Sequence, residues 1–338
     1  MTPPRLRDLD EAGLLAELLP LLGSAGNLAL LGPGDDAAVL AAPSGSVAAT
    51  TDSMVRGVDW RDDWSSPWEV GGKLVMQNVA DVAAMGAVPT GLLLTIAADP
   101  ATELAWLRSL CEGVGHAAAQ VGAGVVGGDV SGAPEGVVVL GMTALGDLEG
   151  RPPVTRGGAR PGDVVAVAGS LGWSGGGLAL YLAGRTPPQL YRHSDEADKA
   201  VATFMWSHRQ PTAAWSSGPV AAQAGATAML DVSDGLVRDA GRIARASGVG
   251  IDLDGAALRA EADGPLTVAL GVDEALRQVL GGGEEHSLLA CFPDEASVPQ
   301  DRSAPWRVIG RVVEPTSEPG VTLDGQAIEV TGWDHFAR

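Results

Sequence analysis

The side chains that suggest chemistry in this chain are aspartates that stand beside glycine, threonine or serine. Each group comes where a short apolar run ends, and glycine there lets the backbone approach a ligand closely. A further acid, Asp81, lies in an apolar helical pattern from Lys73 to Pro89, and a buried carboxylate requires a cationic partner or a metal ion. The other groups are Gly34-Asp35-Asp36, Thr50-Thr51-Asp52, Gly127-Gly128-Asp129 and Asp231-Val232-Ser233-Asp234.

The donor atoms of these groups are hard oxygens, with almost no His or Cys nearby. Such oxygens suit magnesium or calcium rather than zinc. A magnesium ion takes only one or two carboxylates and completes its octahedron with water and substrate phosphates. The set therefore indicates several ions and a polyphosphate, and hence phosphoryl transfer. Each group alone has an ordinary explanation, since Asp is common at turns.

Alternating helices and strands are expected to position these aspartates. Strands are expected at 37–41, 46–51, 91–97, 136–145, 163–168, 226–230 and 249–253, and helices at 9–22, 73–89, 102–120, 196–207 and 235–247. The stretch 148–162 is crowded with Pro and Gly and has no periodic pattern, so it is the best boundary between domains. We predict a mixed α/β (α+β) fold of two domains, residues 1–150 and 151–338.

The composition excludes several classes of partner. A net charge of -20 argues against nucleic acid and anionic membranes, because both repel an acidic surface. Two cysteines are too few for a disulfide framework, and the first residues lack the apolar segment of a signal peptide. The sequence contains no uninterrupted run of about 18 apolar residues, which is the length needed to span a bilayer. We therefore predict a cytoplasmic protein.

Two common nucleotide-binding motifs are not supported. The only Gly-Lys pair, Gly72-Lys73, is followed by Leu74, so the P-loop pattern is absent. Gly122, Gly124 and Gly127 match a dinucleotide fingerprint by letter, but a helix precedes them and a turn-rich stretch follows. A nicotinamide-dependent oxidoreductase is kept only as the alternative from another reaction class.

Taken together, the motifs of the chain resemble the thiamine-monophosphate kinase family. This family belongs to a superfamily that also holds aminoimidazole-ribotide synthetase and selenophosphate synthetase. The resemblance runs from Gly34 to the C-terminus and covers nearly the whole chain. Its motifs are Gly34-Asp35-Asp36-Ala37-Ala38, Thr50-Thr51-Asp52, Asn78-Val79-Ala80-Asp81, Gly127-Gly128-Asp129, Asp231-Val232-Ser233-Asp234-Gly235-Leu236, Gly282-Gly283-Glu284 and Gly332-Trp333-Asp334-His335-Phe336.

This resemblance implies an ATP-dependent kinase that converts thiamine monophosphate to thiamine diphosphate by direct transfer of the γ-phosphoryl group. It implies ATP and Mg²⁺ as cofactors, and a synthetase-like homodimer whose N-terminal domains build a shared β-barrel. The nucleophile would be a phosphate oxygen that is already anionic near neutral pH, so no general base is required. Catalysis then consists of aligning two phosphate groups and neutralising their charge.

The same motif match implies which residues form the site. The implied metal ligands are Asp36, Thr50, Thr51, Asp52, Asp81, Asp129, Asp231 and Asp234. The implied ATP contacts are Gly128, Asp129, Arg156 and Ser233. The implied thiamine contacts are Asp59, Glu284, Glu285 and Trp333. Of these residues, Asp129, Arg156 and Asp234 are expected to act directly in phosphoryl transfer.

The chain departs from the family pattern at two places, both on the implied thiamine side. Asp59 stands where the family usually has His, and the usual Gly-Gly-Glu-Asp-Tyr-Glu appears as Gly282-Gly283-Glu284-Glu285-His286-Ser287. A kinase or synthetase of the same superfamily with a different phosphate acceptor is therefore the main alternative. A selenophosphate synthetase needs a reactive Cys near the N-terminus, whereas the first Cys here is Cys111. A divalent-cation-binding protein without catalytic activity is the alternative outside enzymes.

Overall fold

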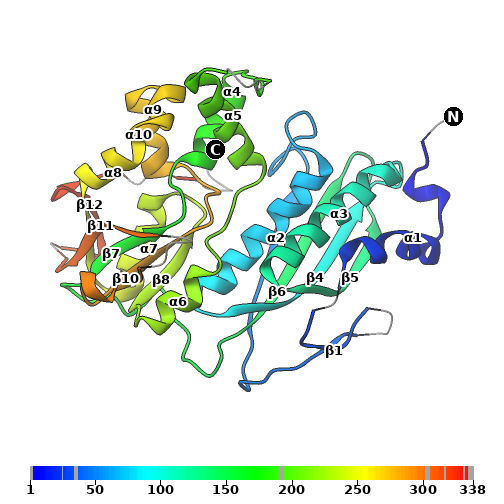
Figure 1. The fold of residues 1–338 in the computed structure, drawn as a ribbon, viewed down its shortest axis with the longest axis horizontal. Helices are drawn as coiled ribbons and strands as arrows, with labels where there is room; N and C mark the ends of the chain where they lie inside the picture. Colours follow the sequence, from blue (N-terminus) through cyan, green and yellow to red (C-terminus); the bar gives the residue numbers. More distant parts are fainter. Residues whose placement is uncertain are drawn as a thin grey trace. The chain divides into compact units, whose positions relative to one another are not determined.

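The computed structural model describes residues 3–24, 26–33, 37–189, 194–300, 305–315, 317–329 and 332–333. The chain divides into two compact units, and Figure 1 shows a mixed α/β arrangement in each. Unit 1 comprises Met1–Val82 and Ala87–Gly150, and unit 2 comprises Ala83–Gly86 and Arg151–Arg338. The predicted mixed α/β, two-part fold class is therefore confirmed. No helix of the described residues is long and apolar enough to cross a lipid bilayer.

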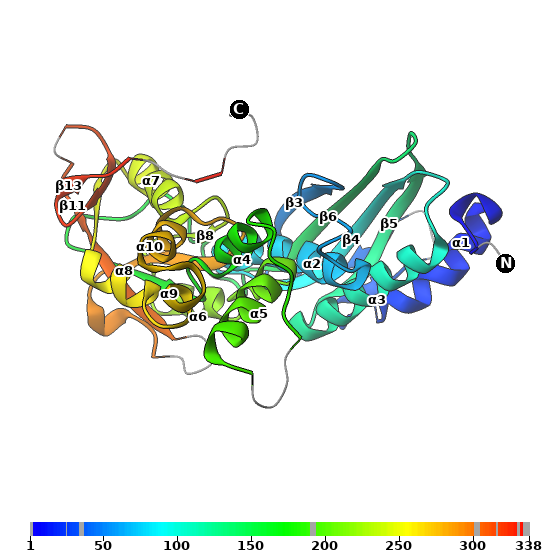
Figure 2. The same cartoon turned by 90° about the horizontal axis from the view of Figure 1, so that it is seen from above.

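Unit 1 is built on a four-stranded sheet with two long helices on one side (Figure 2). Neighbouring strands are antiparallel, except that β4 and β5 are parallel. In order across the sheet, the strands are β3 (Ala48–Val55), β6 (Val138–Asp147), β4 (Val88–Ala98) and β5 (Gly124–Gly132). The helices are α2 (Pro67–Ala84) and α3 (Leu104–Val121), and the smaller elements are α1 (Glu11–Leu18), β1 (Ala29–Leu31), β2 (Val39–Leu40) and the 3-10 turns Leu6–Asp8 and Leu19–Leu22.

Small residues let the two long helices of unit 1 pack closely. A Cβ atom at Gly71 of α2 would collide with the carbonyl of Leu110, and one at Gly113 of α3 would collide with the carbonyl of Trp68. Side chains of the helices and of alternate strand residues form the core between helices and sheet, as the alternating burial of β6 shows. Consequently one face of the sheet is covered by helices, and the other carries residues that are partly or fully exposed.

The barrel implied by the family resemblance is shared between two copies, so it remains a prediction for a single chain. The sheet of unit 1 is open, and no closed barrel forms among the residues that the structure describes. Two of the aspartate groups expected where short apolar runs end lie inside strands instead. Thr50-Thr51-Asp52 lies inside β3, and Gly127-Gly128-Asp129 lies inside β5, because both segments pair along their length with neighbouring strands. Gly128 suits this pairing, since a Cβ there would collide with the carbonyl of Leu94.

Unit 2 is built on a seven-stranded sheet with the order β13-β12-β9-β11-β7-β10-β8. All neighbours are antiparallel except β12 and β9. The strands are β7 (Val164–Ala168), β8 (Ala228–Val232), β9 (Gly250–Leu253), β10 (Ser287–Phe292), β11 (Trp306–Val313), β12 (Gly320–Leu323) and β13 (Gln326–Ala327). The helices are α4 (Trp173–Leu182), α5 (Glu196–Arg209), α6 (Ser217–Gln223), α7 (Leu236–Ser247), α8 (Gly255–Ala262), α9 (Pro265–Leu270) and α10 (Val272–Gly281), with a 3-10 turn at Glu295–Ser297.

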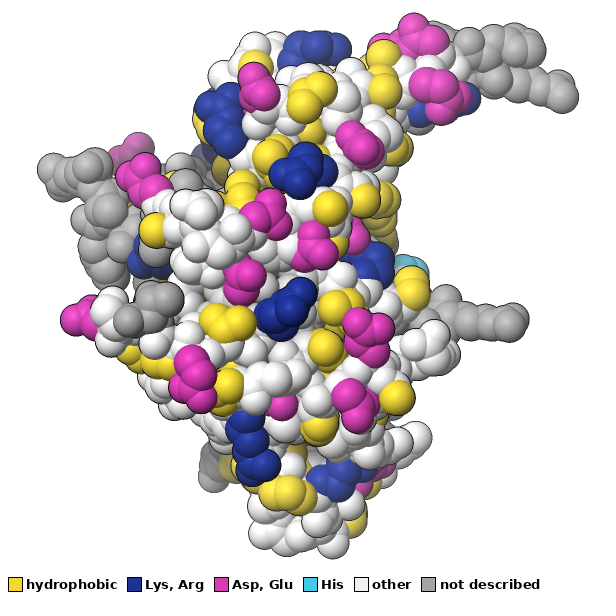
Figure 3. Space-filling model, turned by 90° about the vertical axis from the view of Figure 1, so that its left-hand side faces the viewer, with side chains coloured by type: hydrophobic (Ala, Val, Ile, Leu, Met, Phe, Trp, Pro, Cys, Tyr) yellow, Lys and Arg dark blue, Asp and Glu magenta, His cyan; other side chains and the backbone are white. Residues whose placement is uncertain are grey.

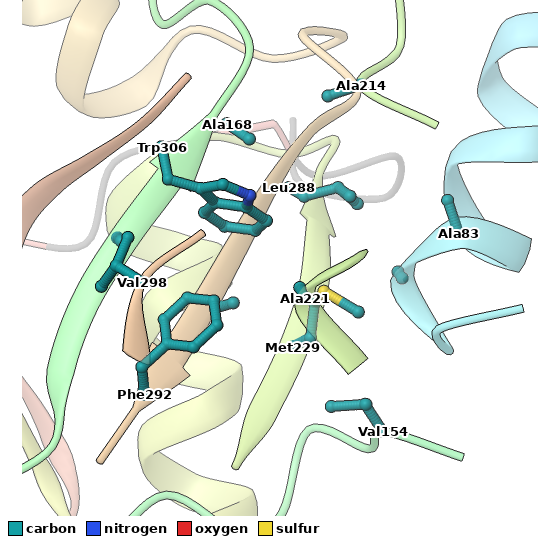
Figure 4. Packing of buried hydrophobic residues seen from close by; sticks show 13 residues of the cluster. Ala83, Val154, Ala168, Ala214, Ala221, Met229, Leu288, Phe292, Val298 and Trp306 are labelled. Atoms are coloured by element: carbon teal, nitrogen blue, oxygen red, sulfur yellow. The ribbon is translucent and has the colours of Figure 1, made fainter. Parts of the chain in front are cut away.

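The core of unit 2 lies on the central strands of this sheet. Every residue of β8 and β10 is buried, as expected for strands that are covered on both faces. Figure 4 shows the cluster around Phe292 and Trp306, whose rings meet edge to face with centroids 5.3 Å apart. This rigid centre holds the loops at the ends of β8 and β10.

The surface drawn in Figure 3 carries acidic, basic and hydrophobic side chains in a mixed pattern. The net charge of -20 is therefore not concentrated in one acidic patch on this face. Hydrophobic side chains on this face are interspersed with charged ones and do not form one broad patch.

Candidate active site

Helix α2 and strand β3 bring three of the implied metal ligands together in unit 1. The Thr50 hydroxyl donates a hydrogen bond of 2.7 Å to Oδ2 of Asp81. Asp52 lies two residues further along β3, on the same face as Thr50, and its amide donates to the buried side chain of Asn78 at 3.1 Å. The Asn78 amide in turn donates to the carbonyl of Leu74, which fixes its orientation. Thr50 and Asp52 therefore face the same side of the sheet, and both strand positions are bonded to side chains of α2.

Two other implied ligands lie on the opposite face of the same sheet. Thr51 is exposed, and its hydroxyl lies 3.2 Å from that of Thr143 on the neighbouring strand. Asp129 is also exposed, pairs in register with Thr95, and accepts a 2.7 Å hydrogen bond from Ser131. Thr95 pairs with Gly141, Gly141 pairs with the residue that follows Asp52, and paired residues face the same side of a sheet. Asp52 itself faces the opposite side, because consecutive residues of a strand alternate between faces. Strand geometry therefore separates Thr51 and Asp129 from Asp52 and Asp81. Asp36 lies outside the described residues.

Asp59 closes a turn that follows β3. Its Oδ2 accepts a 2.6 Å hydrogen bond from the amide of Val55. Its carbonyl accepts a 3.2 Å hydrogen bond from the ammonium group of Lys73, a side chain that is almost fully buried. The side chain that replaces the usual family His thus has a structural partner of its own, and its contact with substrate remains a prediction.

Backbone hydrogen bonds gather the functional segments of unit 2, although they are far apart in sequence. The amide of Glu284 donates to the carbonyl of Ser233 at 2.7 Å, and the amide of His286 donates to the carbonyl of Val232 at 2.9 Å. The amide of Trp333 donates to the carbonyl of Asp234 at 2.9 Å. The loop between β8 and α7 is therefore bonded to both of the segments that are expected to contact thiamine.

This β8–α7 loop is wrapped around a buried carboxylate, that of Asp239. One oxygen of Asp239 accepts hydrogen bonds from the amides of Ser233, Asp234 and Gly235 at 3.1, 2.9 and 3.1 Å. The other oxygen pairs with Arg242. Burial raises the pKa of Asp239 to about 7, and the charge of Arg242 opposes that rise. Asp239 thus fixes the backbone on which Ser233 and Asp234 stand.

The two implied metal ligands in unit 2 already have partners. The carboxylate of Asp234 pairs with Arg242, and Nε of Arg238 lies 3.9 Å from it. The carboxylate of Asp231 is buried and lies 3.4 Å from Nδ1 of His286, which is also buried. Positive charge beside Asp234 weakens its attraction for a cation. Its role as a metal ligand remains a prediction.

Glu284 and Glu285 differ sharply in environment although they are neighbours. The Glu285 side chain is buried and accepts hydrogen bonds from the Ser170 hydroxyl at 2.9 Å and from the amides of Ser174 and Gly175 at 2.7 and 3.3 Å. Burial raises the pKa of Glu285 to about 7, and these donors oppose the rise. Glu284 instead has a side chain that is 33% exposed. Of the two acids, Glu284 is the one that a ligand can reach.

Arg156 lies at the far end of α7 from this group of loops. Its carbonyl accepts a 3.1 Å hydrogen bond from Ser247, the last residue of α7, whereas Ser233 precedes the first turn of the helix. A helix of 12 residues is about 18 Å long. Unit 2 alone therefore does not bring the Arg156 backbone near Ser233, and the predicted ATP contact of Arg156 stays a prediction.

Comparison with known proteins decides the family. The model of the N-terminal domain of AIR synthase related proteins matches residues 34–148, and that of the C-terminal domain matches residues 160–321. The thiamine-monophosphate kinase of Mycobacterium tuberculosis H37Rv is 42% identical over 312 residues, which cover 91% of this chain and 86% of that protein. The chain belongs to the thiamine-monophosphate kinase family.

Solved structures of thiamine-monophosphate kinases agree in fold. The enzyme of Stenotrophomonas maltophilia K279a superimposes with a TM-score of 0.78 at 27% identity, covering 93% of this chain and 97% of that one. The structure of AaThiL complexed with AMPPCP and TMP superimposes with a TM-score of 0.75 at 31% identity, covering 99% of this chain and 100% of that one. The two-part architecture of this family member therefore corresponds to that of the solved kinases along nearly its whole length.

The donor atoms of this family member fit magnesium best in unit 1. Within the parts of the chain that the structure describes, no three His, Cys, Asp or Glu side chains gather closely enough to hold a metal. A magnesium ion requires only one or two carboxylates, and Thr50, Asp52 and Asp81 offer two carboxylates and a hydroxyl without any nitrogen or sulfur. Asp234, paired with guanidinium groups, fits less well.

Three residues of the site were not predicted from the sequence of this family member. Asp239 gave a signal, because an acid in the first turn of a helix after Gly235 is favoured by the helix dipole. Arg242 stands three residues after Asp239, a spacing that allows an ion pair on a helix. No sequence signal pointed to His208, because its partner Glu284 is far away in sequence and only the fold brings them together.

Proposed function

We propose that this chain transfers the γ-phosphoryl group of ATP to thiamine monophosphate and releases thiamine diphosphate and ADP. The observation that carries the proposal is the convergence of Ser233, Glu284 and Trp333 on one loop system in unit 2. It is supported by relatives that are thiamine-monophosphate kinases and by the similarity to AaThiL complexed with AMPPCP and TMP. ATP and thiamine monophosphate are therefore the substrates that we assign to the chain.

The reaction requires alignment and charge neutralisation rather than proton removal. A bond forms between an anionic oxygen of the substrate phosphate and the γ-phosphorus, while the bond from that phosphorus to ADP breaks. The attacking oxygen carries no proton near neutral pH, so no side chain has to act as a base. Thr50, Asp52 and Asp81 would hold a magnesium ion, which when bound supplies positive charge beside the phosphate oxygens.

The thiamine end of the substrate fits the loops of unit 2. Thiamine carries a cationic thiazolium ring, which is attracted both by a carboxylate and by the face of an indole. Glu284 supplies a partly exposed carboxylate and Trp333 an indole that is 50% exposed. Their backbones are held against the β8–α7 loop by the bonds to Ser233 and Asp234. We assign Glu284 and Trp333 to thiamine binding, and Ser233 with Gly128 to the nucleotide.

We further propose a homodimer that forms through unit 1. The face of the four-stranded sheet opposite α2 and α3 carries exposed residues such as Ser53 and Thr95 along its strands. Two such sheets from two copies would pair their free edge strands and form a shared barrel of eight strands. Light scattering on the purified chain is expected to give twice the monomer mass of 34.2 kDa, and a monomer at micromolar concentration would overturn the proposal.

The proposed activity is tested by mixing the purified chain with ATP, Mg²⁺ and thiamine monophosphate, and by separating the products chromatographically. Equal amounts of thiamine diphosphate and ADP are expected. A reaction with thiamine in place of the monophosphate controls for the acceptor, because thiamine lacks the attacking phosphate. ADP without thiamine diphosphate, or no turnover, would contradict the proposal.

A further inference from the structure

We propose that His208 is a positioning residue that holds the carboxylate of Glu284 in place for the thiamine cation. The inference rests on the proposed function, since it concerns how this site recognises its substrate. His208 belongs to α5, and its side chain is almost fully buried beside the functional loops. It reaches Glu284 from an element that contributes no other residue to the predicted site.

The backbone that carries His208 is fixed by close packing of α4 against α5. Gly177 of α4 leaves no room for a side chain, because a Cβ there would collide with the carbonyl of Phe204 and lie 2.8 Å from Cβ of His208. The ring of His208 also packs against that of Tyr181, with centroids 6.0 Å apart. The imidazole therefore has little freedom to move, which is what a side chain that orients another requires.

One ring nitrogen of His208 faces two oxygens. Nδ1 lies 3.4 Å from Oε2 of Glu284 and 3.4 Å from the hydroxyl of Ser174. In a catalytic triad the hydroxyl and the carboxylate bond different ring nitrogens of the His. Here both oxygens lie beside the same nitrogen, so the three side chains do not form a triad. A proton on Nδ1 is donated more strongly to a carboxylate than to a hydroxyl. The geometry therefore assigns His208 as a hydrogen-bond donor to Glu284.

The carboxylate of Glu284 benefits from such a partner because its loop is unusual. Glu284 and His286 both have left-handed backbone conformations, with φ of 59° and 53°, which are costly for residues other than glycine. The surroundings hold this backbone, since the Glu284 amide is bound to Ser233 and the Glu285 side chain is anchored on α4. The long side chain of Glu284 still has to be ordered when a ligand binds. His208 reduces that cost by fixing one carboxylate oxygen beforehand.

Three variants of His208 separate this role from a purely structural one. H208L fills the buried space but removes the donor, and H208N places an amide at about the position of Nδ1. H208Q places its amide at about the position of Nε2 instead. We expect H208L and H208Q to raise the KM for thiamine monophosphate, measured at saturating ATP, about tenfold. We expect kcat and the KM for ATP, measured at saturating thiamine monophosphate, to stay within about twofold of the wild type. H208N is expected to stay within about threefold of the wild type in all three constants.

The unfolding temperature of each variant shows whether the variant is folded, and a matched control variant completes the experiment. H116L makes the same substitution at an exposed His of unit 1 and is expected to leave every constant unchanged. An unchanged KM for thiamine monophosphate in H208L would overturn the inference while the proposed function stands. Equal losses in H208N and H208Q would also overturn it, and this comparison still decides if H208L fails to fold. No thiamine diphosphate from the wild-type chain would overturn the proposed function, and the inference with it.

Discussion

The two units place their functional residues by different means. In unit 1 the implied ligands stand on strands, where consecutive side chains alternate between faces, so Thr51 and Asp129 are separated from Asp52 and Asp81. In unit 2 Asp231 stands near the end of β8, but the other corresponding residues stand on loops, and hydrogen bonds from Glu284 and other amides draw these loops together. The loops of unit 2 thus bring several motif residues together, whereas the strands of unit 1 place neighbouring motif residues on opposite faces of the sheet.

Three acids of the two units differ in burial. Asp129 of unit 1 is exposed, whereas Asp239 and Glu285 of unit 2 are buried and bound by backbone amides. A buried acid of this kind fixes the chain around it, because an unpaired carboxylate would be costly there. An exposed acid contributes little to stability and is available to ligands. Mutations in the two units should therefore affect different properties.

The largest expected effect is on activity, from Asp129→Asn in unit 1. Loss of this exposed carboxylate should lower kcat/KM by at least about 100-fold, if it neutralises phosphate charge through a metal ion. The unfolding temperature should change little, because Asp129 is exposed and its hydrogen bond with Ser131 lies at the surface. Glu135→Gln removes another exposed acid nearby in sequence and should leave kcat/KM unchanged. Near-normal activity of Asp129→Asn would remove this residue from the site.

The next effect is on stability, from Arg242→Gln in unit 2. Removing the guanidinium leaves Asp239 buried without its cationic partner, which should lower the free energy of unfolding by about 3 kcal/mol. Urea denaturation measures this loss. Asp63→Asn breaks an exposed ion pair with Arg61 in unit 1, and it should cause no measurable loss. Equal stability of the two variants would show that the contrast between the units is wrong.

The extent to which the sequence predicted this structure follows the same division. Alternating helices and strands were predictable, because the apolar periods of segments such as 102–120 and 136–145 are strong. The continuation of β5 through Gly127-Gly128-Asp129 was not, because glycine favours turns locally and only pairing with β4 keeps the segment extended. The motifs were visible as residue types, but which face each residue occupies depends on register.

The partners of the site in unit 2 could not be predicted for another reason. The contacts of Glu285 with Ser174 and of His208 with Glu284 join residues more than 70 positions apart, and neither pair shows a local pattern. Their proximity is created by the packing of α4, α5 and the end of β10. Sequence motifs therefore predicted which side chains face ligands, and they did not reveal several of the side chains that hold those residues in place.

A smaller effect on stability concerns pH and Glu285. Its pKa is raised from 4.5 to about 7 in the folded chain, so the folded state binds more protons than the unfolded state between those values. Stability should therefore fall as pH rises from 4.5 to 7, and Glu285→Gln should remove about 2 kcal/mol of that fall. Urea denaturation at pH 5 and pH 8 measures it, with Glu295→Gln as an exposed control. The same pH dependence in Glu285→Gln and the wild type would contradict the buried position of Glu285.

The smallest expected effect is on substrate affinity, from Trp333→Ala. The side chain is 50% exposed, so its loss should leave the unfolding temperature unchanged. Loss of the contact with the thiazolium ring should raise the KM for thiamine monophosphate about fivefold, with the KM for ATP unchanged. Trp206→Ala, at an exposed position on α5, is the matched control and should change neither constant. An increase in the KM for ATP instead would place Trp333 on the nucleotide side.

The central claim is that the loops of unit 2 receive the thiamine end of the substrate. A crystal structure of the chain with thiamine monophosphate bound tests it most directly. The thiazolium ring should lie within about 6 Å of the Trp333 indole, and the Glu284 carboxylate should contact the bound thiamine while remaining beside His208. Thiamine monophosphate bound away from both Glu284 and Trp333 would contradict the account.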